Sequence, residues 1–129
     1  MDMERVFALL EDELSYGSFN AALSLAQIYL DGVQVPKDAK KALEYFELAA
    51  DWGSSYALLE IGVLYEEGAL GEVNYKRAED YYQLARERGD GNGAAYLAYQ
   101  KRFLTSEEVD PSEVIALLEE SAARGHLLA

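Results

Sequence analysis

The fold of this chain is decided by residues 21–53, which read AALSLAQIYLDGVQVPKDAKKALEYFELAADWG, because residues 57–89 repeat their pattern. Laid over each other without gaps, the two segments are identical at 10 of 33 positions. The identical residues are mostly small, apolar or glycine, whereas most of the positions that differ are polar. A packing scheme that recurs along the chain, without a recurring surface, is typical of a stacked array of helical repeats.

Glycine marks the period of this repeat. Four glycines lie 36 residues apart: Gly17, Gly53, Gly89 and Gly125. Glycine commonly follows the last turn of a helix because it adopts the left-handed conformation without Cβ strain. The period therefore predicts a single repeat domain with five segments: a half unit at 1–17, repeats at 18–53, 54–89 and 90–125, and the end of the array or the start of a further unit at 126–129. The incomplete ends indicate a piece of a longer array or a short C-terminal cap.

Each repeat divides into two amphipathic helices. Apolar residues at positions i, i+4, i+7 and i+8 define one face of the first helix: Ala21, Leu25, Ile28 and Tyr29, repeated at Ala57, Ile61, Leu64 and Tyr65. The second helices begin at good N-cap residues: Asp38, Asn74 and Asp110. Recurring aromatic residues are expected in the core: Tyr29, Tyr45, Phe46, Tyr65, Tyr81 and Tyr82. The third repeat departs from the pattern at Lys101 and Leu104, so we expect it to pack differently or to be completed by another element.

Composition excludes several functions. A formal net charge of −13 argues against nucleic-acid binding, because the phosphate backbone would be repelled. The chain has no cysteine, and its one histidine is His126, so no catalytic set, cofactor site or metal site is expected. The acidic start does not resemble a signal peptide, and no run of about 18 apolar residues suits a membrane span. These features predict a non-enzymatic protein of the cytoplasm.

The repeated motif resembles the Sel1-like repeat, a relative of the tetratricopeptide repeat. The resemblance rests on Ala21-x-x-x-Leu25-Ala26-x-x-Tyr29-x-x-Gly32 and on the second-helix pattern from Asp38 to Gly53, both of which recur between Ala57 and Gly89. It implies an all-α, right-handed α/α superhelical solenoid of helix-turn-helix repeats. It also implies an adaptor or scaffold that binds proteins, without shared catalytic residues.

By analogy with tetratricopeptide repeats, the first helices are expected to line a concave binding face. The side opposite their packing stripe carries the predicted partner-binding residues: Leu23, Gln27, Asp31, Leu59, Val63, Glu67, Tyr99 and Phe103. This mixture of apolar and acidic side chains suits a protein or peptide with basic and apolar residues. In the alternative interpretation, Leu23, Leu59 and Val63 are buried between helices. The predicted function is a protein-interaction scaffold; the alternative is an acidic inhibitor of a basic partner, such as a toxin or effector.

Overall fold

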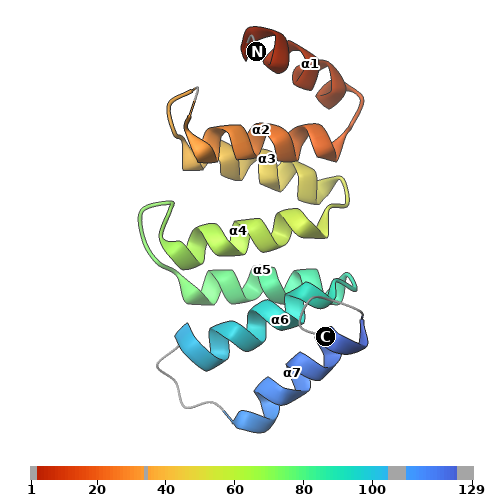
Figure 1. Ribbon diagram of the computed structural model, residues 1–129, viewed down its shortest axis with the longest axis vertical. Helices are drawn as coiled ribbons and strands as arrows, with labels where there is room; N and C mark the ends of the chain where they lie inside the picture. The colour runs from red at the N-terminus through yellow and green to blue at the C-terminus, as the bar shows by residue number, and fades with distance from the viewer. Residues whose placement is uncertain (1–2, 34, 105–109, 125–129) are drawn as a thin grey trace. The chain divides into compact units, whose positions relative to one another are not determined.

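The computed structural model describes residues 3–33, 35–104 and 110–124, and every regular element in these ranges is helical (Figure 1). The elements follow in this order: α1 (Met3–Ser15), α2 (Phe19–Asp31), α3 (Ala39–Asp51), α4 (Ser55–Glu67), α5 (Tyr75–Glu87), α6 (Gly91–Tyr99), η1 (Gln100–Leu104) and α7 (Pro111–Ala123). The predicted all-α fold of helix-turn-helix repeats is confirmed. The chain forms two compact units, Met1–Ala57 and Leu58–Ala129, which are described separately. The predicted boundaries of the repeats stay a prediction.

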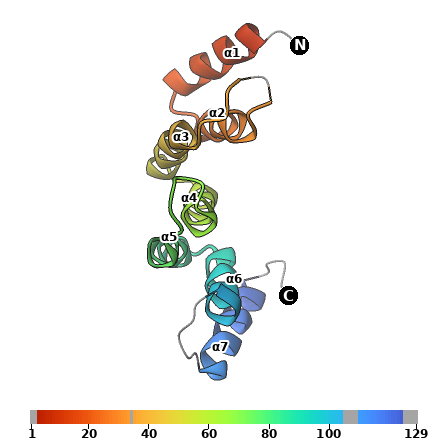
Figure 2. The ribbon, with the colours of Figure 1, turned by 90° about the vertical axis from the view of Figure 1, so that its left-hand side faces the viewer.

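The N-terminal unit is built on the antiparallel pair α2 and α3, with α1 packed on α2 (Figures 1 and 2). Ala21 and Leu25 on α2 and Phe46 on α3 are each 1 % exposed, so the predicted apolar faces do meet. The Phe7 ring of α1 lies with its centroid 6.0 Å from that of Tyr29 on α2. The residues before α2 thus form a helix that packs on α2.

The helix starts recur with the same 36-residue period as the glycines. The second helices begin as predicted, because Asp38, Asn74 and Asp110 each accept a backbone N–H bond through Oδ1, at 2.9–3.0 Å. The first helices have an equivalent series that the sequence analysis missed: Ser18, Ser54 and Asp90. Capping side chains of this kind satisfy backbone donors that have no partner within the helix.

The helix ends also follow the prediction. Gly17, Gly53 and Gly89 have φ angles of 79°, 107° and 92°, which lie in the left-handed region that favours glycine. Within the repeats, Gly32 follows the last residue of α2 with φ 62°, and its N–H donates to the Ile28 carbonyl at 3.2 Å. The fourth glycine of the series, Gly125, lies outside the described residues, as do His126 and the predicted further unit at 126–129.

A stacked pair of tyrosines with a cation joins the two helices of each of the first two repeats. The Tyr29 and Tyr45 rings stack with centroids 6.0 Å apart, and Lys41 Nζ lies 5.4 Å from the Tyr29 centroid. Thirty-six residues later, Tyr65 and Tyr81 stack at 5.9 Å, with the Arg77 guanidinium 5.3 Å from the Tyr65 ring. Four of the tyrosines predicted as core are therefore half-buried parts of a repeated cation–π contact: Tyr29, Tyr45, Tyr65 and Tyr81.

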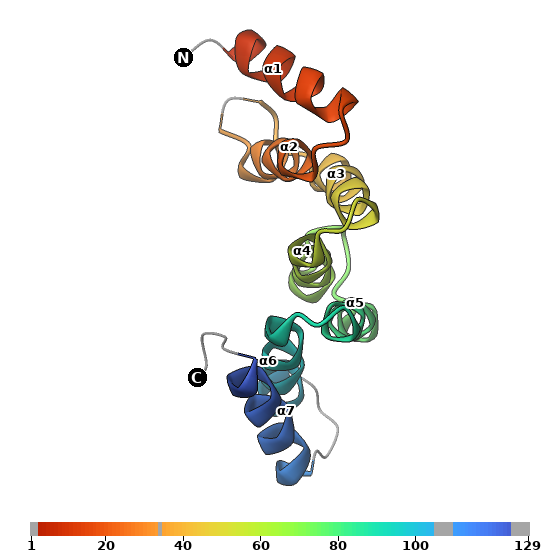
Figure 3. The ribbon, with the colours of Figure 1, turned by 90° about the vertical axis from the view of Figure 1, so that its right-hand side faces the viewer.

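In the C-terminal unit, α4 and α5 form the second helical pair, and α6 packs against both α5 and α7 (Figure 3). Its core includes Ile61, Tyr82 and Leu97, each at most 2 % exposed. Two glycines bring the helices close. A Cβ at Gly62 on α4 would lie 2.4 Å from Cε1 of Tyr82, and a Cβ at Gly93 on α6 would lie 2.6 Å from the Arg86 backbone nitrogen. A residue without a Cβ at position 62 therefore lets the two helices of this pair approach closely.

The third repeat departs from the others through a change of helix type. After α6, residues Gln100–Leu104 continue as a π-helix, a difference that accords with the expected departure of this repeat from the pattern. The Gln100 side chain is fully buried, and its Nε2 donates to the backbone oxygen of Tyr75 at 2.8 Å. Lys101, one of the two residues at which this repeat departs from the pattern, forms an ion pair with Glu113 of α7 at 3.2 Å. Polar contacts from Gln100 and Lys101 thus stand where the first two repeats have an apolar residue and a tyrosine.

An ion pair joins α5 to α7 within the C-terminal unit. Arg86 donates from Nε to Glu120 Oε2 at 2.7 Å and from Nη2 to Oε1 at 2.8 Å, in a two-point geometry that matches guanidinium and carboxylate. This hydrogen bonding lowers the pKa of Glu120 and raises that of Arg86. Because both side chains remain partly exposed, the pair is expected to contribute no more than about 1 kcal/mol.

Replacing Glu120 by glutamine should lower the free energy of unfolding by about 1 kcal/mol at pH 7. Because the folded pKa of Glu120 is depressed, the stabilisation is present above the unfolded carboxyl pKa of about 4.3 and is lost as the pH falls through the folded pKa. Urea unfolding at pH 7 and near pH 3 should show the wild type and variant converging at the lower pH. Exposed Glu119→Gln is the control, and an equal loss in that variant would contradict the assignment.

Candidate functional site

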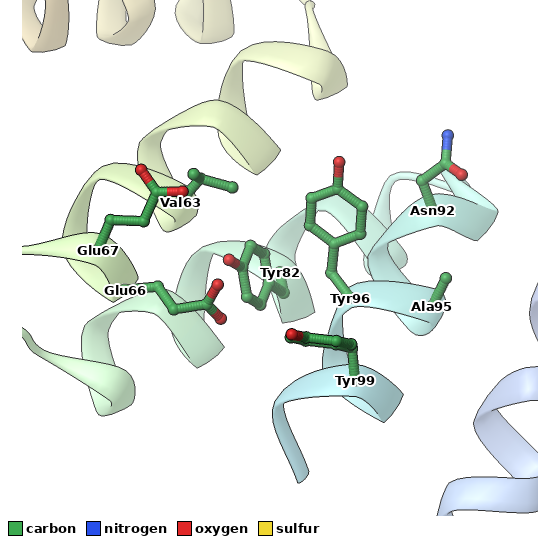
Figure 4. A pocket seen from close by; sticks show the side chains of 8 residues that line it. All are labelled: Val63, Glu66, Glu67, Tyr82, Asn92, Ala95, Tyr96 and Tyr99. Carbon is green, nitrogen blue, oxygen red and sulfur yellow. The ribbon is translucent and has the colours of Figure 1, made fainter. Parts of the chain in front are cut away.

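A pocket of about 400 Å³ opens in the C-terminal unit where α4, α5 and α6 meet (Figure 4). Its lining combines carboxylates, aromatic rings and small residues: Val63, Glu66, Glu67, Tyr82, Asn92, Ala95, Tyr96 and Tyr99. Val63 and the two glutamates lie on the last two turns of α4. Tyr96 and Tyr99 lie one turn apart on α6.

Tyr82 forms the floor of this acidic pocket. It is 1 % exposed and comes from α5, and its hydroxyl is hydrogen-bonded to the Glu66 carboxylate. The Tyr96 ring stands edge-on to Tyr82, with centroids 5.2 Å apart and an interplanar angle of 82°. Such an edge-on arrangement is favourable for aromatic pairs, and Tyr96 is the more exposed of the two rings. The pocket therefore has a buried aromatic base with a carboxylate beside it.

The electrostatic environment of the acidic pocket is negative. Burial raises the pKa of Glu66; the Tyr82 hydroxyl partly offsets this, and the neighbouring Glu67 carboxylate adds to it. Burial also raises the pKa of Tyr96, and the carboxylates of Glu60, Asp90 and Glu66 raise it further. The residues that line the pocket include two carboxylates and neither lysine nor arginine. This arrangement favours a cationic guest.

A second, apolar pocket of about 320 Å³ lies beside the first, between α6, η1 and α7. It shares Ala95 and Tyr99 with the acidic pocket, and its other lining residues are Ala98, Arg102, Phe103, Val114 and Leu118. The Tyr99 and Phe103 rings lie with centroids 5.1 Å apart and are 54 % and 65 % exposed. An exposed pair of large aromatic residues is a feature of binding surfaces.

The structure places the predicted partner-binding residues in different surroundings. Val63, Glu67 and Tyr99 line the acidic pocket, and Phe103 lines the apolar pocket. Leu59 is only 2 % exposed, so it is buried between helices, as the alternative interpretation expects.

The other three predicted residues lie on α2 of the N-terminal unit. Leu23 is half-buried there, while Gln27 and Asp31 are exposed and joined by a hydrogen bond from Nε2 to Oδ1 at 2.7 Å.

Five residues of the acidic pocket were missed from the sequence: Glu66, Tyr82, Asn92, Ala95 and Tyr96. Tyr82 was correctly assigned to the core, but its hydroxyl also orients Glu66. The available signal was divergence between repeats. The residue 36 positions before Glu66 is Leu30, and the residue 36 positions before Tyr96 is Glu60. A polar or aromatic residue at a position that differs between repeats therefore indicates a candidate binding residue.

Two other features bear on the chemistry of the chain. In residues 3–33, 35–104 and 110–124, no three acidic or histidine side chains gather closely enough to hold a metal ion. In the same part of the chain, none of the helices has the length and apolar character that crossing a bilayer requires.

The sequence profile of the Sel1 repeat matches residues 20–54 and 55–90. A comparison with curated protein sequences finds no significant match.

Among solved structures, a Sel1 repeat protein from Oxalobacter formigenes superimposes with a TM-score of 0.83 at 22 % identity, over 97 % of this chain and 51 % of that one. The protective antigen c5321 of uropathogenic Escherichia coli, which displays an SLR fold, gives 0.76 at 24 % identity, over 93 % of this chain and 26 % of its own. Helicobacter pylori cysteine-rich protein B gives 0.65 at 20 % identity, over 91 % and 89 %. This chain thus spans about half of the first protein and about a quarter of the second.

Proposed function

Because the chain belongs to the Sel1 repeat family, we propose that it is a non-catalytic interaction module that binds a partner protein through the exposed faces of its first helices. Proteins of this family are generally protein-interaction scaffolds. The observation that carries the proposal is the acidic pocket, which α4 and α6, both first helices of their repeats, line together with Tyr82 of α5. The residues predicted on the α2 face, Asp31 among them, are a second candidate contact surface.

The partner segment is proposed to be basic, with apolar residues that contact the exposed rings. This follows from the two carboxylates of the acidic pocket and from the net charge of −13, which attracts a basic protein and speeds its association. The same charge favours a second candidate function, an inhibitor that neutralises a basic toxin or effector. The two candidates differ in salt dependence, because an inhibitor held mainly by exposed charges would release its partner as ionic strength rises.

The test is affinity capture from the native cell with the chain as bait, followed by mass spectrometry, at low and high salt. The double variant Asp31→Lys/Glu67→Lys reverses the charge at the last residue of α2 and of α4, and it should lose the captured basic partner while it remains folded. The matched control is Asp51→Lys/Glu87→Lys, which makes the same change at the exposed ends of α3 and α5. If both double variants capture the partner as the wild type does, the first-helix surface is not the binding face.

A further inference from the structure

We propose that the two pockets of the C-terminal unit form one peptide site. The acidic pocket takes an arginine or lysine side chain, and the apolar pocket takes a bulky apolar side chain of the same segment. This site rests on the proposed function and deepens it, because it defines which chemistry a partner must present. The occupant is therefore a linear basic–apolar segment of another protein.

The first support is the charge in the acidic pocket. Glu66 is half-buried against Tyr82, and its immediate charged neighbour is another carboxylate, Glu67. Partial burial costs a carboxylate hydration, and a cation placed beside it would restore favourable interactions. Because the lining of the pocket contains no lysine or arginine, an incoming cationic side chain would supply this charge. A cation in a partly desolvated site gains more from a carboxylate than it would in water.

The second support is the aromatic wall. Tyr82, Tyr96 and Tyr99 all line the acidic pocket, and Figure 4 shows the Tyr82 ring between the Glu66 carboxylate and the rings of Tyr96 and Tyr99. The faces of tyrosine rings attract cations, most often the planar guanidinium of arginine. Carboxylates and rings together thus offer the two kinds of contact that a guanidinium combines, hydrogen bonding at its edge and stacking on its face.

The third support is the continuity between the pockets. Ala95 and Tyr99 line both, so a short segment that fills one pocket passes directly to the other. Phe103 lies four residues after Tyr99, on the π-helical turn that the buried Gln100 anchors to the Tyr75 carbonyl. π-helical turns are frequent at functional sites. The departure from the repeat pattern thus lies within the proposed binding surface.

The probe for the test is a set of 12-residue peptides selected from a random display library on the immobilised chain. We expect the selected peptides to share an arginine or lysine close to a bulky apolar residue. Replacing that arginine by citrulline, which has nearly the same shape without the charge, should weaken binding about tenfold in fluorescence anisotropy. For a lysine, the acetylated residue serves the same purpose.

The protein variants locate the effect. The double variant Glu66→Gln/Glu67→Gln should bind the arginine peptide about tenfold more weakly and should bind the arginine and citrulline forms equally. Tyr99→Ala and Phe103→Ala should each weaken both forms. The controls are Glu119→Gln on α7 and Tyr16→Ala in the N-terminal unit, which are exposed and line neither pocket. Circular dichroism melting of every variant verifies folding.

Two results would overturn this site. One is the selection of peptides whose binding is insensitive to the glutamine variant and to citrulline; the other is a selection that yields no basic–apolar peptide. Either result leaves the proposed function standing if the cellular capture still depends on the first-helix surface. Conversely, if the peptides behave as expected but no cellular partner depends on Glu67, the pocket is real and the proposed function fails. The two failures are thus distinguishable.

Discussion

Replacing Gly93 by alanine should lower the free energy of unfolding by about 1–3 kcal/mol, despite the higher helix propensity of alanine. The new Cβ would lie 2.6 Å from the Arg86 nitrogen, 2.7 Å from the Tyr82 carbonyl oxygen and 3.0 Å from the Arg86 Cα. All three atoms belong to the backbone of α5, so no rotation of a side chain can make room. The first turn of α6 would have to move away from α5. Urea unfolding followed by circular dichroism measures the loss.

A double-variant cycle shows whether the backbone is the obstacle. In an Arg86→Ala background the cost of Gly93→Ala should be the same within about 0.5 kcal/mol, because shortening that side chain removes none of the clashing atoms. A neutral or stabilising Gly93→Ala would show that α6 does not lie this close to α5. The comparison with the earlier repeats is informative, since Ala57 and Ala21 occupy the equivalent positions. The repeat alignment alone would therefore predict that alanine is tolerated.

The period of the sequence predicts what each repeat has in common. Asp38 and Asn74 begin second helices, Gly53 and Gly89 follow second helices, and Ile61 is buried, all as the pattern indicates. These features depend on hydrogen bonds and packing within one helical pair. Each can be inferred from a short window because the interacting residues are close in sequence. The N-cap residues of the first helices, which were missed, also bond to residues two or three positions along the chain. Their 36-residue spacing could therefore have predicted them.

The candidate site could be predicted only in part, because it is built where the repeats differ. Val63 and Glu67 were inferred from helix geometry, but Tyr96 reaches the pocket through the packing of α6 against α5. The π-helix at Gln100–Leu104 depends on a contact with the Tyr75 carbonyl, 25 residues away in the chain. No local pattern indicates such a shift in hydrogen bonding. A site built from residues that differ between repeats is thus the part that the repeat pattern cannot predict.

Gly62 connects this packing to the candidate site. Gly62→Leu should destabilise the protein by about 1–3 kcal/mol, because a Cβ would meet the Tyr82 ring at 2.4 Å. The ring cannot move freely, since it is buried and its hydroxyl is hydrogen-bonded to Glu66. The first repeat has Ala26 and Phe46 at the equivalent positions, where the ring carries no hydroxyl. Gly62 thus leaves the space that the Tyr82 ring occupies beside Glu66.

The decisive measurement is again a double-variant cycle, and here the two effects are expected not to add. Tyr82→Ala removes the ring atoms that Gly62→Leu would strike, so the double variant should be more stable than the sum of the single effects predicts. Purely additive losses, or an unchanged melting temperature for Gly62→Leu, would rule out the contact. Binding of the arginine peptide by Gly62→Leu should weaken even below its melting temperature, because a displaced Tyr82 no longer orients Glu66.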